Sequence, residues 1–368
     1  MAHAGGPRPS SALVGVALLA VSAVSAAIVA SSPAPYVIER PGPVFDVLGD
    51  VEVEGQAVPL ISIPLEETYP TEGALRMLTV SIAGTPGALP NWLEVAGAYL
   101  DPRMDVLPVE RVYPPGVTEE ETAEESRIEM ENSQREAIAA ALVALDYPIE
   151  SDLTVEGFTE GAPSVGVLET GDRIVSVNGR TFESVQDLRE ALADNGVERP
   201  AEVVFERAGV EHAVEITPIL SDGEEPVPVL GILVASEFEF PFTVRIQLEN
   251  VGGPSAGMMF ALGIIDKLTE GSLTGGEDVA GTGTIAASGE VGAIGGIRQK
   301  MYGARDAGSD WFLAPVDNCD EVVGHVPDGL RVVPVSTLDD ALAVLGVVRA
   351  GGDANALPTC EQALQTAR

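Results

Sequence analysis

The chain has 368 residues, and because 45% of them are hydrophobic it is not a wholly disordered protein. At about 150 residues per domain, this length predicts two domains. The formal net charge of −37 argues against nucleic acid as a partner, because neutralising phosphates requires clusters of Lys and Arg. Two cysteines exclude a disulfide framework and a Cys-based zinc cluster. With three histidines in the chain, we expect no metal and no other cofactor.

Residues 12–30 form an uncharged, apolar stretch near the N-terminus. It is just long enough to span a hydrocarbon core of roughly 30 Å, so it predicts a transmembrane anchor within residues 1–32. A cleaved signal peptide is the alternative, although its apolar region usually runs about 7–15 residues. Arg8 precedes the stretch and Glu39 follows it. This charge order predicts a single-pass protein of the cell membrane, with a cytoplasmic N-terminus and the rest of the chain outside.

Residues 33–146 begin with a Pro-rich connector and then read as strands followed by a helix. Apolar and β-branched residues cluster over 51–63 and 75–82, which predicts strands. Ile138, Leu142 and Leu145 recur at helical spacing, so residues 132–146 predict an amphipathic helix.

Residues 147–220 show a different sequence pattern, with short apolar stretches that predict strands around the turn signal Asn178-Gly179. Residues 168–179 read L-x-x-G-D-x-I-x-x-V-N-G, and the segment resembles a bacterial PDZ domain. PDZ domains bind extended peptides by adding a strand to a sheet edge, so a peptide ligand is expected. The alternative is a domain used only for spacing or gating, because no glycine-rich carboxylate loop is evident near residues 155–161.

The strongest signal for chemistry is Ser255, which lies in the sequence G-G-P-S-A-G at residues 252–257. An alternating stretch before it predicts a strand, and an apolar stretch after it predicts a buried helix. Small neighbours allow a substrate to approach the backbone, and the N–H groups at a helix N-terminus can stabilise an oxyanion. The alternative is that Ser255 only caps the helix.

A nucleophilic serine needs a base, and the sequence leaves two interpretations. The pattern G-x-S-x-G matches the nucleophile turn of α/β-hydrolases, in which His325 would be the base. That fold requires several parallel strands before the serine, and only about 20 residues follow the PDZ-like segment before the strand that leads to it. The second interpretation is Lys300, whose pKa would fall from near 10.4 if its amine were desolvated. A solvated surface lysine is the alternative for Lys300.

The sequence G-P-S-A-G, followed by G-G-I-R-Q-K at residues 295–300, resembles the proteolytic domain of Lon proteases. The resemblance implies Ser255 as nucleophile, Lys300 as general base and Thr282 as a hydroxyl near this dyad. It also implies an oxyanion-binding loop formed by Gly253, Pro254 and Ala256. Gly252 stands where many Lon proteases have an acidic residue, so the role of that acid is absent or moved.

The order of segments resembles that of membrane-anchored, PDZ-containing Lon-like proteases of bacteria. The expected fold class is therefore α+β, with a Lon-type domain that starts in residues 33–146, continues over 227–348 and contains an inserted PDZ domain. A transmembrane helix would precede it.

The function implied is that of a serine endopeptidase that hydrolyses exported or membrane-proximal proteins. It would be independent of ATP, since G-x-x-x-x-G-K-[ST] does not occur. The resemblance also implies a homo-oligomeric ring. A non-catalytic PDZ scaffold is the alternative from a different class.

The segment 349–368 is rich in Gly and Ala, and we expect a flexible tail. Cys319 and Cys360 could form a disulfide in an oxidising compartment or remain as two thiols, because the sequence does not give their separation.

Overall fold

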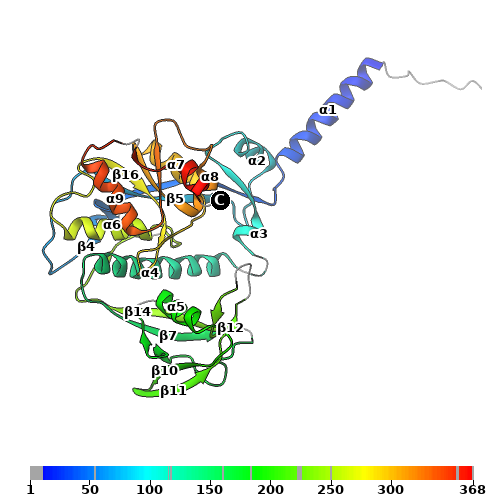
Figure 1. The fold of residues 1–368 in the computed structure, drawn as a ribbon. Helices are drawn as coiled ribbons and strands as arrows, with labels where there is room; N and C mark the ends of the chain where they lie inside the picture. The colour runs from blue at the N-terminus through cyan, green and yellow to red at the C-terminus, as the bar shows by residue number, and fades with distance from the viewer. Residues whose placement is uncertain are drawn as a thin grey trace, which may run out of the picture.

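The computed structural model describes residues 11–53, 55–114, 116, 118–159, 161–182, 185–221, 226–248, 251–353 and 356–366. Figure 1 shows a larger body of strands and helices, with helix α1 (Ser11–Ala30) projecting from it. A smaller body, which consists mainly of strands, lies beneath the long helix α4 (Glu119–Ala144).

A six-stranded sheet forms the centre of the larger body, in the order β20-β19-β16-β5-β1-β6. The four strands from β20 to β5 are parallel, and β1 runs antiparallel to both β5 and β6. The strands are β1 (Tyr36–Asp46), β5 (Ala74–Ala83), β6 (Asp105–Pro108), β16 (Asp278–Gly281), β19 (Trp311–Pro315) and β20 (Arg331–Val335).

Successive residues of these strands enter two different cores, because side chains alternate across a sheet. Val279 and Leu313 face the core that contains α4, α6 (Gly257–Leu268) and α9 (Leu338–Arg349). Ala280 and Phe312 face the second core, with α7 (Ile297–Asp306), α8 (Cys319–Val322) and α10 (Cys360–Thr366). The larger body is therefore a three-layer arrangement of helices, sheet and helices.

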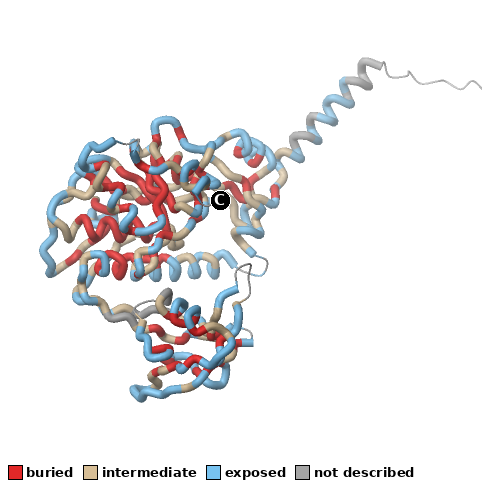
Figure 2. The backbone as a smooth tube through the Cα atoms, in the orientation of Figure 1, coloured by how far each residue is buried: buried red, intermediate tan, exposed pale blue. Residues whose placement is uncertain are grey.

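Helix α4 begins with a capping box, in which the Thr118 hydroxyl accepts from the Glu121 backbone N–H and the Glu121 carboxylate accepts from Thr118 N–H. Its first turns are exposed, and its buried residues start at Met130. The contrast along the helix is visible in Figure 2. Only the second half of α4 packs on the core next to α6.

The smaller body is an antiparallel sheet in the order β11-β10-β8-β7-β14, and β9 pairs with β8. Helix α5 (Val185–Asn195) covers it, with Leu188 and Leu192 in the core of the sheet. The strands are β7 (Glu150–Phe158), β8 (Arg173–Val177), β9 (Arg180–Thr181), β10 (Ala201–Arg207), β11 (Val210–Ile216) and β14 (Ile232–Glu239).

The boundary at residue 220 that the sequence suggested stops short of this sheet, because β14 pairs with β7 along its whole length. This pairing joins the two ends of the segment, and a pattern of apolar residues does not show which distant strand is the partner. Strands from before residue 150 and after residue 239 meet in the central sheet of the larger body.

The remaining elements are short. They are β2 (Asp50–Val53), β3 (Gln56–Pro59), β4 (Ile61–Ser62), α2 (Trp92–Ala98), α3 (Val109–Val112), β12 (Ile219–Leu220), β13 (Pro228–Val229), β15 (Arg245–Ile246), β17 (Thr284–Ile285), β18 (Val291–Gly292) and a 3-10 turn, η1 (Val316–Asn318).

Helix α1 coincides with the apolar stretch expected to be an anchor, and its described side chains, such as Leu19 and Val29, are exposed. Within the part of the chain that the structure describes, no helix reaches the combination of length and hydropathy needed to cross a membrane. The anchor is therefore not confirmed.

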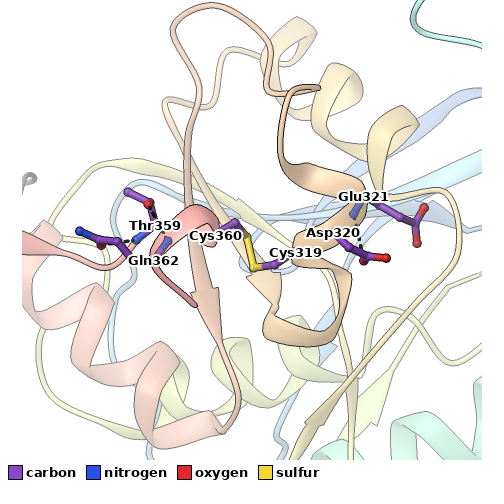
Figure 3. The surroundings of a disulfide bond; sticks show 6 residues. All are labelled: Cys319, Asp320, Glu321, Thr359, Cys360 and Gln362. Atoms are coloured by element: carbon purple, nitrogen blue, oxygen red, sulfur yellow. Dashed lines mark hydrogen bonds between the residues drawn. A yellow bond between two sulfur atoms is a disulfide. The ribbon is translucent and has the colours of Figure 1, made fainter. Parts of the chain in front are cut away.

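The C-terminal segment differs from the flexible tail that its composition suggested. It contains α10, which is attached to α8 by a disulfide between Cys319 and Cys360 (Figure 3). Their sulfur atoms are 2.07 Å apart, and both cysteines are buried. The covalent bond and the packing of Cys360 in the second core hold this helix to the body.

Candidate active site

Ser255 lies in the turn that leads into α6. The helix has Ala256 as its N-cap, and no side chain caps it. Ser255 therefore does not cap the helix, which excludes the alternative that capping is its only role. The helix that follows is buried from Gly257 to Asp266, which is all but its last two residues, so the turn has a rigid support.

Lys300 is placed by the periodicity of α7. Ile297, Met301 and Ala304 recur on one face and are fully buried against the central sheet. Lys300 lies on the same side of the helix, and its residue is only 2% exposed. The helix approaches β5 closely at its start, where a side chain at Gly296 would lie 2.6 Å from Val80. Gly296 also has a φ of 67°, which favours glycine.

Burial lowers the pKa of Lys300 to about 7, and the negative charge of Glu39 acts in the opposite direction. At this pKa, about half of the amines are neutral at pH 7, whereas a solvated lysine is almost entirely charged. A neutral amine has a lone pair that can accept a proton from a hydroxyl. Desolvation therefore makes Lys300 suitable as a general base at neutral pH.

Thr282 connects Lys300 to the turn that carries Ser255. The Lys300 Nζ donates to Thr282 Oγ1 at 3.1 Å, and this hydroxyl donates to the Ser255 carbonyl oxygen at 2.9 Å. The same carbonyl accepts from Gly283 N at 2.9 Å. Because the amine donates to Thr282, its lone pair is left for another group. No hydrogen bond joins Lys300 to the Ser255 hydroxyl in the described part of the structure.

Ser255 and Lys300 line one cavity of about 490 Å³. Its walls come from β1, β5, α4, the turn before α6, the loop before α7 and α7 itself. The lining residues are Glu39, Pro43, Met77, Leu78, Thr79, Val80, Ser81, Ile82, Met130, Val251, Gly252, Pro254, Ser255, Ala256, Gly295 and Lys300. The nucleophile and base inferred from the sequence therefore face the same space.

Two bonds from α4 fix the loop before Ser255. Gly253 N donates to the Ser126 carbonyl at 2.9 Å, and the Ser133 hydroxyl donates to the Pro254 carbonyl at 2.9 Å. Gly253 has a φ of 81°, a conformation that other residues rarely adopt. Sequence reasoning missed Ser126 and Ser133, although their spacing of seven residues puts them on one face of a helix and was the available signal.

Fewer N–H groups can bind an oxyanion than the sequence suggested for the loop of Gly253, Pro254 and Ala256. The N–H of Gly253 is already bonded to Ser126, and Pro254 has no N–H. Among the described residues, the N–H groups of Ser255 and Ala256 have no hydrogen-bond partner. These two groups, at the start of α6, are the ones that could stabilise an oxyanion.

The competing base, His325, is not part of this arrangement. It is exposed in the turn after α8 and does not line the cavity. Lys267 also lies elsewhere, with its Nζ donating to the Leu48 carbonyl at 3.3 Å. In the described ranges, no three His, Cys, Asp or Glu side chains are grouped so that they could hold a metal ion.

Comparison with known proteins gives matches to this region. Residues 250–347 match the Lon protease (S16) C-terminal proteolytic domain family. The chain is 39% identical over 94 residues to the Lon protease of Azospirillum brasilense, which covers 24% of this chain and 11% of that protein. It is 40% identical over 86 residues to the mitochondrial Lon protease homolog of Candida dubliniensis, covering 23% of this chain and 8% of that protein. The chain thus spans about a tenth of the length of these relatives.

Comparison with solved structures gives matches at low similarity. The PDZ domain of the SdrC-like protein from Listeria monocytogenes is 20% identical with a TM-score of 0.20, covering 22% of this chain and 85% of that one. The corresponding domain from Listeria innocua is 23% identical with a TM-score of 0.21, covering 23% and 92%. By the family match over residues 250–347, the segment that holds Ser255, Thr282 and Lys300 is similar in sequence to the proteolytic domain of Lon proteases.

Proposed function

We propose that the protein is a serine endopeptidase that uses Ser255 as nucleophile and Lys300 as general base. The observation that carries this proposal is a lysine that is 2% exposed, has a pKa of about 7 and lines the same cavity as Ser255. The similarity of residues 250–347 to a proteolytic domain supports the same reaction class.

The reaction would begin when the neutral Lys300 amine accepts the hydroxyl proton as the Ser255 oxygen attacks a peptide carbonyl. The N–H groups of Ser255 and Ala256 would stabilise the negative oxygen of the tetrahedral intermediate. Lys300 would then return the proton to the leaving amine, which leaves an ester on Ser255 that water hydrolyses. Thr282 would orient the amine by accepting one of its N–H groups.

Extended substrates are favoured by the shape of the site. The catalytic cavity shares Met130, Val251 and Gly252 with a second cavity of about 760 Å³, which follows α4 away from Ser255. Two adjoining cavities of this size would accommodate an unfolded segment rather than a folded domain. Independence from ATP is part of the proposal, and addition of ATP should leave the rate unchanged.

The test compares the full chain with Ser255→Ala and Lys300→Ala on an unfolded protein such as casein. Loss of cleavage in both variants, and loss of labelling by a fluorophosphonate in Ser255→Ala, is the expected result. Full activity of Lys300→Ala with loss in His325→Ala would reject the proposed base. Cleavage by Ser255→Ala at the native rate would reject the proposed nucleophile.

The smaller body would bind an extended peptide. Its strand β14 lies at the end of the sheet order, where an added strand can pair, and Leu233 on this strand is 55% exposed. Binding of fluorescent peptides to the full chain, weakened by Leu233→Glu, tests this function.

We also propose that the enzyme acts outside the cytoplasm, attached to a membrane through α1. The disulfide Cys319–Cys360 supports an oxidising compartment, and the exposed apolar side chains of α1 support attachment. Protease accessibility in intact cells and extraction of the full chain with detergent, but not with carbonate, are the expected results. Assembly into a ring is tested separately by light scattering of the detergent-solubilised chain.

A further inference from the structure

The catalytic cavity contains a second ionisable group besides Lys300. Glu39 on β1 is half-buried and lines the cavity, and the other lining residues are uncharged. Across the described residues, its carboxylate has neither a hydrogen bond nor an ion pair. Gly252 contributes no side chain, and Glu39 is the acidic residue among those that line this cavity.

The neighbours of Glu39 do not neutralise it. Asp105 lies opposite Glu39 on β6, and the Asp105 carboxylate is paired with Arg298 of α7 at 2.7 Å. Burial and the charge of Asp105 raise the pKa of Glu39, whereas Lys300, Arg111 and Arg298 act at longer range to lower it. Arg298 is thus already paired with Asp105, and within the described residues no cation forms an ion pair with Glu39.

Apolar side chains form much of the rest of the cavity wall, together with the polar side chains of Thr79, Ser81 and Ser255. Its walls include Met77, Leu78, Ile82, Met130 and Val251. A long side chain with an apolar stem and a positively charged end fits such a space, because the stem contacts the walls and the end pairs with the carboxylate. An acidic side chain would be repelled by Glu39, and an uncharged one would leave this carboxylate desolvated without a partner. The formal net charge of −37 also favours the approach of cationic peptides.

We propose that Glu39 selects substrates with a Lys or Arg side chain next to the scissile bond by pairing with its positive charge. The proposal rests on the peptidase function proposed above and names its substrate class.

Pairing with Glu39 also has a consequence for the base. The charge of Glu39 is what opposes the effect of burial on Lys300. A substrate cation that neutralises Glu39 removes this opposition, so the neutral amine is more populated when the matching substrate is bound. Glu39 thereby links recognition of the substrate to activation of Lys300.

The experiment uses matched peptides that span a cleavage site mapped in casein by mass spectrometry. Arginine and citrulline are compared at each of the three positions on either side of the scissile bond, because citrulline keeps the shape and lacks the charge. We expect kcat/KM to be at least about tenfold higher for arginine at one of these positions. Glu39→Gln should bring that ratio close to one, and Glu110→Gln, which removes an exposed charge on α3 outside the cavity, should leave it unchanged.

A second measurement needs no substitution at Glu39 and stands even if that variant fails to fold. The acid limb of the kcat profile of the native chain should lie at lower pH with the preferred arginine peptide than with its citrulline match. Equal kcat/KM for the two peptides at all positions would overturn the proposal, as would an arginine preference that persists in Glu39→Gln. Cleavage of both peptides by Ser255→Ala would instead reject the peptidase function itself.

Discussion

The hydroxyl of Ser133 on α4 donates a hydrogen bond of 2.9 Å to the carbonyl of Pro254, the residue before the proposed nucleophile Ser255. The two residues are 121 positions apart in the sequence, and the smaller body lies between them in the chain. The bond joins the first part of the larger body to the turn that presents Ser255. The position of the nucleophile therefore depends on a helix that lies outside the segment matching known proteolytic domains.

Replacing Ser133 by Ala should lower kcat about tenfold and leave KM nearly unchanged, because a loosened turn places Ser255 less accurately for attack. The free energy of unfolding should fall by about 1 kcal/mol, since the carbonyl of Pro254 loses the shorter of its two hydrogen bonds and keeps the one from Gly257 N at 3.3 Å. Steady-state kinetics and urea denaturation measure the two effects. Ser126→Ala is the matched control, because Ser126 holds Gly253 through its backbone carbonyl, and its kcat should stay close to that of the native chain.

Replacing Thr282 by Val should lower kcat by about 10- to 100-fold. The Lys300 amine would lose the acceptor that orients it, and the Ser255 carbonyl would lose one of its two donors. Thr282→Ser retains the hydroxyl and should recover most of the rate. Kinetics of both variants measure the effect, and an unchanged kcat in Thr282→Val would contradict the positioning role of this hydroxyl.

The sequence could indicate the two proposed catalytic residues because their surroundings are encoded locally. Ser255 lies between glycines in the turn before a buried helix, and Lys300 falls on the apolar face of a short helix with a glycine at its start. Such local patterns are informative because the helix period determines which face is buried. Glycine, in turn, marks positions where the backbone takes a conformation that other residues rarely adopt.

The parts that could not be predicted depend on contacts between distant segments. Glu39 reads as an ordinary charged residue after an apolar stretch, and only the pairing of β1 with β5 brings it to the catalytic cavity. The same holds for β14, whose place in the smaller sheet depends on its partner β7. Composition also suggested a flexible tail, but Cys360 anchors α10 through a bond that the sequence left open.

The rate of peptide cleavage should rise with pH through about 7, because the active form of Lys300 is the neutral amine. A profile of kcat/KM between pH 5 and 9 with an uncharged peptide measures this limb. An acid limb near pH 4, or none at all in this range, would mean that a group other than Lys300 accepts the proton.

The same shift in pKa predicts how Lys300 affects stability. Below pH 7 the lysine is charged in both the folded and the unfolded chain, and between about pH 7 and 10.5 the unfolded chain holds a proton that the folded chain has released. The contribution of Lys300 to stability is therefore unfavourable at low pH and becomes less so as pH rises through this window. Lys300→Met should raise the melting temperature by at least about 4 °C at pH 6, and by less at pH 10.

Lys267→Met provides the control for both measurements on Lys300. Burial lowers the pKa of Lys267 as well, and its amine donates to Leu48 outside the cavity. This variant should keep the catalytic rate and its acid limb. If Lys267→Met and Lys300→Met lost activity equally, the loss would reflect the fold of the domain and not the base.

Breaking the disulfide between Cys319 and Cys360 should destabilise the chain without removing its activity. The two cysteines are 41 residues apart, and closing a loop of this size stabilises a folded chain by about 4 kcal/mol through the entropy of the unfolded state. The bond joins α8 to α10, and neither helix contributes a residue to the catalytic cavity. The double variant Cys319→Ser/Cys360→Ser should therefore melt at a markedly lower temperature and cleave peptides at 25 °C at a rate within about twofold of the native chain.

Calorimetry with and without reductant measures the change in melting temperature, and the reductant should shift only the native chain. A loss of cleavage on reduction, before any melting, would show that α10 holds α7 and its Lys300 in place.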